Sequence, residues 1–300
     1  MAEEPPVKVR LGTRGSRLAM IQSQLFARRL RDAGHDVELV PIVTEGDVRP
    51  IDMSPGEGVF VAAIARALVA GEVDIAVHSA KDVPLDEEAA LVIAAYPERA
   101  DPRDALVTAT GRQSIESLPA HSTVGTDSPR RAGFIRAARG DLRIVPLHGN
   151  VDTRLRRLDR GEVDALVIAA AGLDRLGRGE RIDQRIDPQL VTPAPAQGAL
   201  AIQARRSDGA LLELLAAHDQ PDIRLAVEAE RRVLLATGGT CRAPVGALAF
   251  VEGQRFTMVV GGVNSDGSDL QVESIEGHRA DGIALADAAG RRLARAVMLQ

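Results

Sequence analysis

The chain has 300 residues, 45% of them hydrophobic and 26% charged, which excludes a disordered or membrane-embedded protein and suits two or three globular domains. Its 37 basic and 42 acidic residues give a net charge of −5, so binding of polyanions over the whole surface is not expected. An aromatic content of 2% argues against a stacking platform for single-stranded nucleic acid, and a single cysteine, Cys241, excludes an internal disulfide or a zinc site of several thiolates.

The N-terminal segment is acidic and lacks the apolar stretch of a signal peptide. No run approaches the roughly 18 apolar residues of a membrane span. We therefore expect a cytoplasmic protein that does not enter membranes.

The N-terminal part of the chain alternates strand and helix patterns. Ser16 can cap the first helix, and Gly34 and Gly71 end the first and second helices. The pattern predicts strand, helix, strand, helix and strand, in that order, at residues 7–12, 16–33, 37–43, 59–70 and 74–78. A βαβ unit of this kind predicts a parallel sheet.

Part of this pattern recurs later in the chain. Residues 11–17, with a Gly-Thr turn and a serine at a helix start, have a counterpart in residues 124–131, where Pro129 takes the first helical position. Residues 71–77 are likewise echoed by residues 161–167. The repeat predicts two α/β domains of similar plan that face each other across a cleft, although βαβ proteins in general share such punctuation.

From Pro221 onward the pattern changes. Helices are predicted at both ends of this part, with three hairpin-linked strands between them. The predicted elements are a helix at 223–236, strands at 245–251, 255–261 and 270–275, and a helix at 284–298. Together they predict a small C-terminal α+β domain with a three-stranded antiparallel sheet.

The two Gly-Thr turns are candidate anion sites, because each ends a strand and begins a helix, where backbone N–H groups and the helix dipole favour negative charge. Neither turn has the pattern of a P-loop or a dinucleotide site. Small carboxylates or phosphates fit better. The supporting side chains are Thr13, Arg14, Ser16 and Arg17 in the first turn and Thr126, Ser128, Arg130 and Arg131 in the second.

A third candidate follows the strand at 74–78, in the segment His78-Ser-Ala-Lys81-Asp82. Lys81 and Asp82 are either a surface ion pair, or an acid/base group and the charge that keeps it ionised. Lys81 is one of only two lysines, and all the other basic residues are arginines. This excess of arginine reflects either genome composition or a use for guanidinium forks. His78 is either a satisfied polar side chain or a ligand. No metal is expected, because no HExxH or paired Cys/His spacing is present.

Two arginines and the cysteine remain ambiguous from their local sequence. Arg154 lies either on a solvated basic flank of its helix or turned into the cleft, and Arg175 is similarly ambiguous. Cys241 is either a buried small hydrophobe or, given its flanking glycines and Arg242, a reactive thiol.

Taken together, these segments resemble the porphobilinogen deaminase (hydroxymethylbilane synthase) family. The matching stretches follow the family's order from residue 10 to residue 246. They are Gly-Thr-Arg14-Gly-Ser16-Arg-Leu-Ala, His-Ser79-Ala-Lys81-Asp82-Val-Pro, Asp101-Pro-Arg-Asp-Ala, Val-Gly-Thr126-Asp-Ser128-Pro-Arg130-Arg131, Gly-Asn150-Val-Asp-Thr-Arg154-Leu, Pro-Ala-Gln197-Gly-Ala and Cys241-Arg-Ala-Pro-Val-Gly.

The resemblance implies a chemistry. Cys241 would carry a dipyrromethane cofactor through a thioether, and four molecules of porphobilinogen would lose ammonia and join head to tail before water releases the linear tetrapyrrole. Asp82 would be catalytic and would also contact the cofactor. The other cofactor contacts would be Lys81, Thr126, Ser128, Arg130 and Arg131. Substrate contacts would be Arg14, Ser16, Arg154 and Arg175, with His148 as a further one.

The resemblance also implies a fold of two periplasmic-binding-like α/β domains flanking a cleft, plus a cysteine-bearing third domain. Phe60 matches the end of a lid, and the chain would return to the first domain near Gln197. The expected domains are 1–99 with 197–216, 103–193, and 220–300. We expect a monomer that binds the small molecule porphobilinogen and neither nucleic acid nor membrane.

Three positions depart from the family pattern. Family members usually have Arg where His148 stands, and an imidazole lacks the fork and titrates near neutrality, so we expect a changed pH profile. Glu57 replaces a lysine of the lid. Asp127 replaces a small polar residue, and its carboxylate opposes anion binding unless Arg130 or Arg131 neutralises it.

Three rival functions remain at this stage. A two-lobed anion-binding protein would share the α/β halves but would need neither the third domain nor Cys241. A catalytically impaired family member would keep the fold without chain elongation. A cysteine-nucleophile hydrolase is disfavoured, because no histidine motif accompanies Cys241.

Overall fold

A computed structural model of the chain describes residues 6–44, 61–86, 88–239 and 243–297. The described residues separate into two compact units, each treated on its own below. The first comprises residues 6–44, 61–86, 88–98 and 200–220, and the second comprises 99–199, 221–239 and 243–297. The expected second and third domains both fall in the second unit, so the three-domain boundaries stay a prediction.

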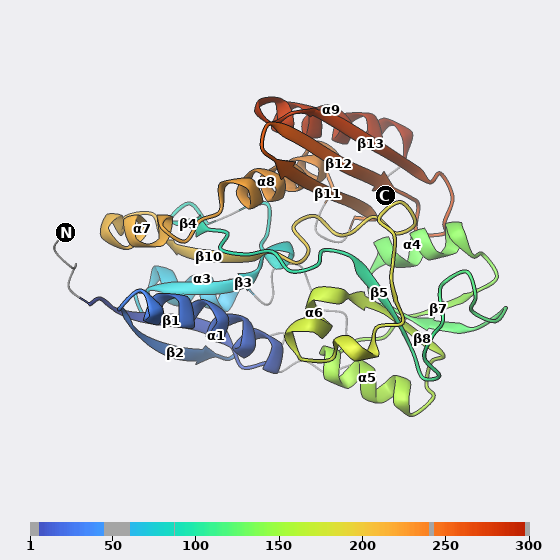
Figure 1. Ribbon diagram of the computed structural model, residues 1–300, viewed down its shortest axis with the longest axis horizontal. Coiled ribbons are helices and arrows are strands. Elements are labelled where there is room, and N and C mark those ends of the chain that lie inside the picture. The colour runs from blue at the N-terminus through green and yellow to red at the C-terminus, as the bar shows by residue number, and fades with distance from the viewer. Residues whose placement is uncertain (1–5, 45–60, 87, 240–242, 298–300) are drawn as a thin grey trace. The chain divides into compact units, whose positions relative to one another are not determined.

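The first unit is built on a mixed sheet whose order, within the described residues, is β2-β1-β3-β10-β4 (Figure 1). Its strands are β1 (Lys8–Arg14), β2 (Asp36–Ile42), β3 (Ile75–Ser79), β4 (Leu91–Ala95) and β10 (Leu200–Arg205). β1 pairs in parallel with β2 and β3, which confirms the predicted βαβ unit. β10 runs antiparallel to both β3 and β4, so the chain returns to this sheet after a long excursion.

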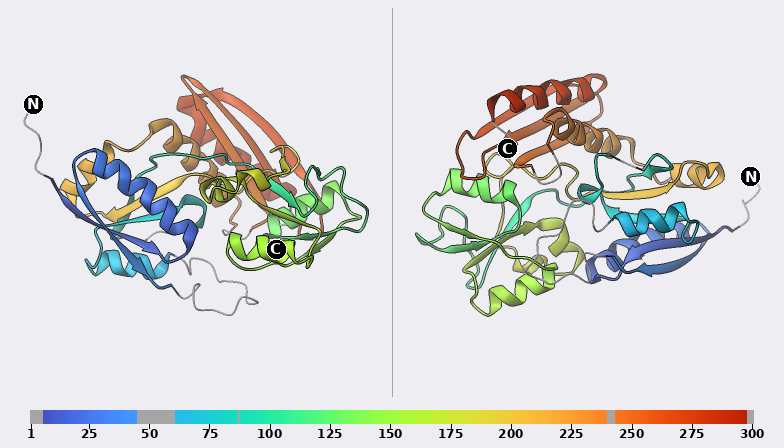
Figure 2. Two further views of the ribbon diagram at one scale, coloured as in Figure 1. Left: turned by 60° about the horizontal axis from the view of Figure 1, so that its bottom comes forward. Right: turned by 180° about the vertical axis from the view of Figure 1, so that it is seen from behind.

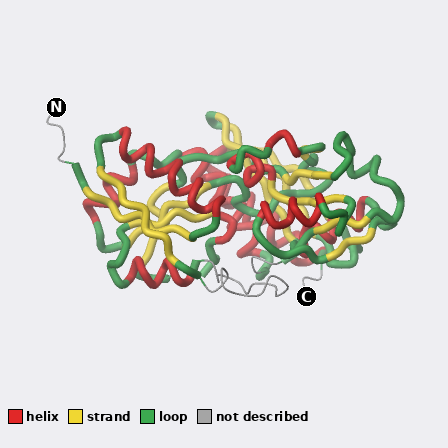
Figure 3. Tube along the Cα trace, turned by 90° about the horizontal axis from the view of Figure 1, so that it is seen from below, coloured by secondary structure: helices red, strands yellow, loops and turns green. Residues whose placement is uncertain are grey.

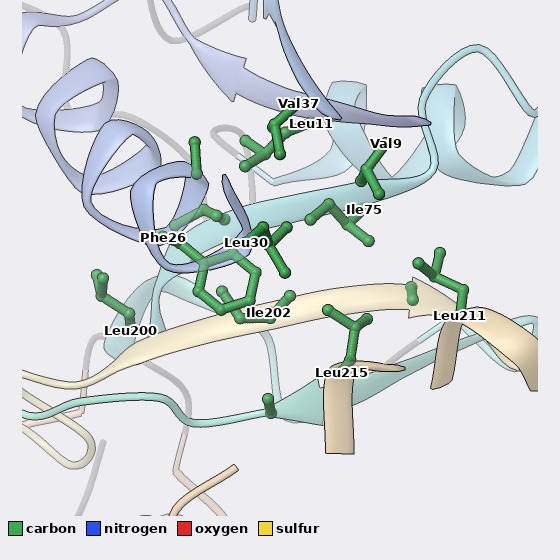
Figure 4. Close-up of a cluster of buried hydrophobic side chains, with 14 residues drawn as sticks. Val9, Leu11, Phe26, Leu30, Val37, Ile75, Leu200, Ile202, Leu211 and Leu215 are labelled. Atoms are coloured by element: carbon green, nitrogen blue, oxygen red, sulfur yellow. The ribbon is translucent and has the colours of Figure 1, made fainter. Parts of the chain in front are cut away.

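Helices cover both faces of this sheet (Figure 3). They are α1 (Arg17–Asp32), α3 (Ala62–Val69) and α7 (Gly209–Ala216). On one face, Phe26 of α1 and Leu215 of α7 pack against Ile75 and Ile202 of the strands (Figure 4). On the other face, Ile64 and its neighbours in α3 form a second buried cluster. A sheet buried on both sides leaves its polar chemistry to the loops at the strand ends.

The second unit repeats this plan in the sheet β7-β6-β8-β5-β9. Its strands are β5 (Asp104–Thr108), β6 (Thr123–Gly125), β7 (Arg143–Val145), β8 (Ala165–Ala169) and β9 (Gln184–Arg185). β6 is parallel to β7 and β8, and β5 is antiparallel to β8. Its helices are α4 (Pro129–Ala138), α5 (Val151–Asp159) and α6 (Ala170–Arg175). They too are packed in two clusters, one containing α4 and the other α5 and α6.

The repeat extends to individual hydrogen bonds. Asp74 Oδ2 accepts from the Arg10 backbone N–H at 2.8 Å, and Asp164 Oδ2 accepts from the Thr123 N–H at 2.7 Å. Gly71 and Gly161, three residues before each aspartate, both have φ +72°, a backbone conformation that glycine adopts without strain. The recurrence predicted from the sequence is therefore confirmed: strands β2, β1 and β3 of the first sheet correspond to β7, β6 and β8 of the second.

The C-terminal part of the second unit is a three-stranded antiparallel sheet with two helices on one face (Figure 2). Its elements are α8 (Pro221–Ala236), β11 (Val245–Glu252), β12 (Arg255–Gly262), β13 (Gln271–His278) and α9 (Gly282–Ala296). Gly290 lets the two helices approach, because a Cβ there would lie 2.6 Å from the Val233 carbonyl oxygen. The predicted α+β tail is confirmed. β13 runs further than predicted, to residue 278, because it pairs along the whole of β12.

A buried ion pair joins this tail to the rest of the second unit. Glu230 of α8 is fully buried and accepts hydrogen bonds at 2.7 and 2.9 Å from the two terminal nitrogens of Arg99. The same carboxylate accepts from the backbone N–H groups of Ala196 and Ala249, at 2.6 and 2.7 Å. One side chain of α8 therefore fixes β11 and two segments of the second α/β region.

His78 makes the stability of the first unit dependent on pH. Its ring is buried in β3, with Nε2 3.2 Å from Gln203 Oε1, and burial lowers the pKa of His78 from 6.5 to about 4. The unfolded chain then binds more protons than the folded one between these values, so stability falls as the pH decreases through this range. Going from pH 7 to pH 4, we expect this group to cost about 3 kcal/mol.

The measurement is urea unfolding of the wild type and of His78→Gln at a series of pH values. His78→Gln should flatten the loss of stability between pH 7 and pH 4. His121→Asn, which removes an exposed imidazole, should leave that loss unchanged. An identical pH dependence in His78→Gln and the wild type would assign the effect to another group.

Candidate functional site

In the first unit, the candidate residues gather at the carboxyl ends of β1 and β3. Because these strands are adjacent and parallel, both ends lie at the same edge of the sheet. Arg14 ends β1, and Ser16 caps α1 by accepting a hydrogen bond from the Ala19 N–H at 3.4 Å. The first turn of α1 carries no acidic residue, which leaves its N–H groups suited to an anion.

The end of β3 carries Lys81 and Asp82 in a short 3₁₀ turn, Ala80–Asp82. Asp82 is exposed and Lys81 is half-buried. Both interpretations of Lys81 and Asp82 therefore stay predictions. Ser79 links this turn to α1, because its Oγ lies 3.0 Å from the side-chain nitrogen of Gln22. The sequence left His78 as either a satisfied polar side chain or a ligand. Its contact with Gln203 favours the first alternative.

In the second unit, the candidates lie at the carboxyl ends of β6, β7 and β8. Ser128 caps α4 by accepting from the Arg131 N–H at 3.4 Å, with Pro129 in the first turn and Thr126 buried just before it. The segment after β7 carries His148 and leads into α5 with Arg154, and Arg175 ends the helix that follows β8. The arrangement matches that of the first unit.

A buried carboxylate that sequence reasoning did not single out holds two of the predicted arginines. Asp104 begins β5 and is fully buried. Its Oδ2 lies 2.8 Å from Arg130 Nη2, and its Oδ1 lies 2.7 Å from Arg131 Nη2. Gln197 donates to the same Oδ1 at 2.8 Å. Burial opposes the ionisation of Asp104, but the two guanidinium groups hold its pKa well below the usual range.

This cluster turns Arg130 and Arg131 inward. Their side chains are only 4% and 8% exposed, and Arg130 also donates to the carbonyl of Thr192. Two positive charges share one negative charge, so the cluster keeps an excess of about one positive charge beneath the N-terminus of α4. The signal for Asp104 was present in the sequence, since an acid opens a strand whose next three residues are apolar.

Arg154 lies partly buried at the start of α5, not on a solvated flank. Its Nε donates to the Gly149 carbonyl at 2.8 Å. Burial and the like charges of Arg131 and Arg157 lower the pKa of Arg154 to about 10, with Asp127 opposing them. Arg175 donates to the Gly198 carbonyl at 2.8 Å. Arg154 is thus a cation in surroundings that hold more positive than negative charge.

Asp127 and His148, two of the three departures, lie against each other. His148 Nδ1 is 2.8 Å from Asp127 Oδ2, although the two are not aligned as a hydrogen bond. Arg130 and Arg131, the two candidates for neutralising Asp127, are both paired with Asp104.

Three predicted residues lie outside the described part of the chain: Cys241, Phe60 and Glu57. Over the described ranges, no group of three or more His, Cys, Asp or Glu side chains is arranged to hold a metal ion. In the same ranges, no helix has the length and apolar character needed to cross a membrane.

The fold and these groups define a class: an α/β protein with two sheets of like plan, each with basic side chains and a helix N-terminus at the carboxyl edge of its parallel strands. The family model described as "Porphobilinogen deaminase, dipyromethane cofactor binding domain" matches residues 9–213. The porphobilinogen deaminase of Acidothermus cellulolyticus is 47% identical over 95% of this chain and 87% of its own length. That of Roseiflexus castenholzii is 46% identical over 83% of each chain. The chain belongs to the porphobilinogen deaminase family.

Among solved structures, a periplasmic binding protein of Salmonella typhimurium aligns with 70% of this chain and 91% of its own, at 11% identity and a TM-score of 0.41. A likeness of that size adds nothing to the assignment, which the sequence matches already carry.

Asp104 sets the stability of the second-unit site. Asp104→Asn leaves two inward guanidinium groups without a counter-charge, and we expect it to cost about 3–5 kcal/mol of unfolding free energy. Arg130→Met should cost less, because Asp104 keeps Arg131 as its partner. Adding Arg130→Met to Asp104→Asn should recover part of the loss.

Urea unfolding of the four proteins checks this order. Glu230→Gln, which removes another buried carboxylate paired with an arginine, serves as the matched control, and Arg130→Met should not rescue it. Additive losses in the double variant would mean that Asp104 and Arg130 are not coupled.

Proposed function

We propose that the chain is a hydroxymethylbilane synthase, a transferase that joins four molecules of porphobilinogen head to tail with loss of ammonia and then releases the linear tetrapyrrole by hydrolysis. The observation that carries the proposal is the excess of guanidinium charge around the N-terminus of α4, in a chain whose net charge is −5. Each pyrrole of substrate and product bears an acetate and a propionate, so this local cationic site has a matching ligand.

The residues present fit a dipyrromethane cofactor. Its carboxylates need cations and N–H donors, and the second unit offers Arg154, Thr126, Ser128 and the first turn of α4, with Arg131 adding positive charge from its buried pair with Asp104. A bound carboxylate would offset the positive surroundings that lower the pKa of Arg154. When bound, the dipyrromethane supplies the free pyrrole position at which chain growth begins.

We assign Asp82 as the catalytic residue. Departure of ammonia leaves a delocalised positive charge on the substrate pyrrole, and a carboxylate can stabilise that charge and accept a proton. Asp82 suits this role, because it is exposed at the carboxyl end of a strand and no partner in the described residues occupies it. Lys81, next to it in the sequence, contacts the cofactor.

The remaining assignments follow from position. Arg14 and Ser16 bind substrate carboxylates with the first turn of α1, and Arg175 does so from α6. Cys241, in the segment between α8 and β11, is the point of cofactor attachment, and Phe60 ends a lid. The tail from residue 220 acts as a third domain. The enzyme works as a cytoplasmic monomer on free porphobilinogen, without nucleic acid or membrane.

The first test is the intact mass of the freshly purified protein. We expect a mass above that of the polypeptide by two linked pyrrole units, and we expect Cys241→Ala to have the bare mass. Porphobilinogen added to the wild type should give further mass increments of one pyrrole unit each. A bare mass that does not change on incubation with porphobilinogen would contradict the assignment. Loading without further increments would identify a member that has lost elongation.

The second test concerns Asp82. We expect Asp82→Asn to fold as the wild type does and to lower kcat by about 10²–10⁴-fold, the usual contribution of a positioned acid or base. Asp86→Asn, which follows Asp82 in the chain and is also exposed, is the matched control and should keep kcat within a few-fold. A near-normal kcat in Asp82→Asn, measured on protein with the loaded mass, would move the catalytic role elsewhere.

A further inference from the structure

Asp127 and His148 come from neighbouring parallel strands and meet at one edge of the second sheet. Asp127 follows β6 and immediately precedes the capping Ser128 of α4, and His148 follows β7. Their facing atoms are 2.8 Å apart, and the side chains are 19% and 15% exposed. His148 Nδ1 is shielded from solvent and has no aligned hydrogen bond, so the strength of the contact depends on the charge of the imidazole.

The charged groups around this pair come from two helices. α4 contributes Arg131, whose charge is shared with Asp104, and α5 contributes Arg154 and Arg157, the latter paired with Glu162. The first turn of α5 also carries Asp152. Arg154 is tied to the residue after His148 by its bond to the Gly149 carbonyl, and it feels the charge of Asp127 directly. Arg154 is therefore the cation whose electrostatic surroundings change most when the charge of the pair changes.

We propose that Asp127 and His148 form a charge-coupled pair that determines how strongly the second unit binds the carboxylates of its ligand. With a neutral imidazole, the Asp127 carboxylate competes with the ligand for Arg154 and for the N–H groups of α4. With a protonated imidazole, Asp127 is neutralised and those groups serve the ligand. The inference rests on the proposed function, because it takes a carboxylate-bearing pyrrole as that ligand.

The pair gives the binding step a definite pH dependence. An imidazole carries a positive charge at low pH and is neutral at high pH. Ligand binding should therefore be tightest near pH 6 and weaken towards pH 8.5. Loss of one neutralising unit charge near the bound carboxylate should raise KM on the order of tenfold. Because a carboxylate is bound in the ground state and the transition state alike, kcat should change little through this pair.

Four variants separate the pair from a merely structural contact. In Asp127→Asn the competing carboxylate is gone, and in His148→Arg the neutralising charge is permanent. Both should keep a low KM from pH 6 to pH 8.5. His148→Gln never carries the charge, so its KM should be high at both ends of that range. His121→Asn, an exposed histidine of the same unit, should keep the wild-type profile.

A second readout needs no turnover. In the Cys241→Ser background, which has no thiol to carry the cofactor, porphobilinogen should raise Tm more at pH 6 than at pH 8.5. Adding Asp127→Asn should remove that difference. A KM profile or a Tm difference in Asp127→Asn equal to that of its parent would overturn the proposal. Failure of the proposed function looks different, since the protein would then have its bare mass and no turnover at any pH.

Discussion

One buried carboxylate, Asp104, constrains much of the second unit. It is the shared acceptor for two guanidinium groups and an amide, which come from α4 and from the segment near residue 197. Leaving any of these charges buried without a partner costs several kcal/mol, so the strand, the helix and the segment are held in one arrangement. That arrangement fixes the N-terminus of α4, and it leaves one positive charge more than Asp104 can match.

The two sheets explain why chemistry appears where it does. Each is covered by helices on both faces, so the polar groups that are free to meet a ligand lie at the carboxyl ends of the parallel strands. The same local device, a strand followed by a serine-capped helix, occurs once in each unit, at Ser16 and at Ser128. The two units therefore repeat the same local geometry and differ in the side chains around the caps.

Local features of the fold were predictable from the sequence, because glycine, proline and serine act through the nearest few residues. Ser16, Gly34 and Pro129 mark helix ends where the structure has them. Contacts between distant segments were not predictable in this way. The pairing of Asp104 with Arg130 spans 26 residues and that of β10 with β3 more than a hundred, and both depend on how whole elements pack. The candidate residues could be identified from their sequence motifs, whereas the side chains that bind them could be identified only from the folded structure.

The same distinction changes how departures from a family pattern are interpreted. Considered alone, His148 lacks a fork for a carboxylate, and Asp127 places a negative charge at a helix N-terminus that favours anions. Because the two side chains are in contact, the free energy of ligand binding depends on their sum and on Arg154 beside them. A site that binds carboxylates is constrained in its total charge more strongly than in the identity of any one residue. Two substitutions that would each weaken it can therefore persist together, and the imidazole then adds a dependence on pH that an arginine could not provide.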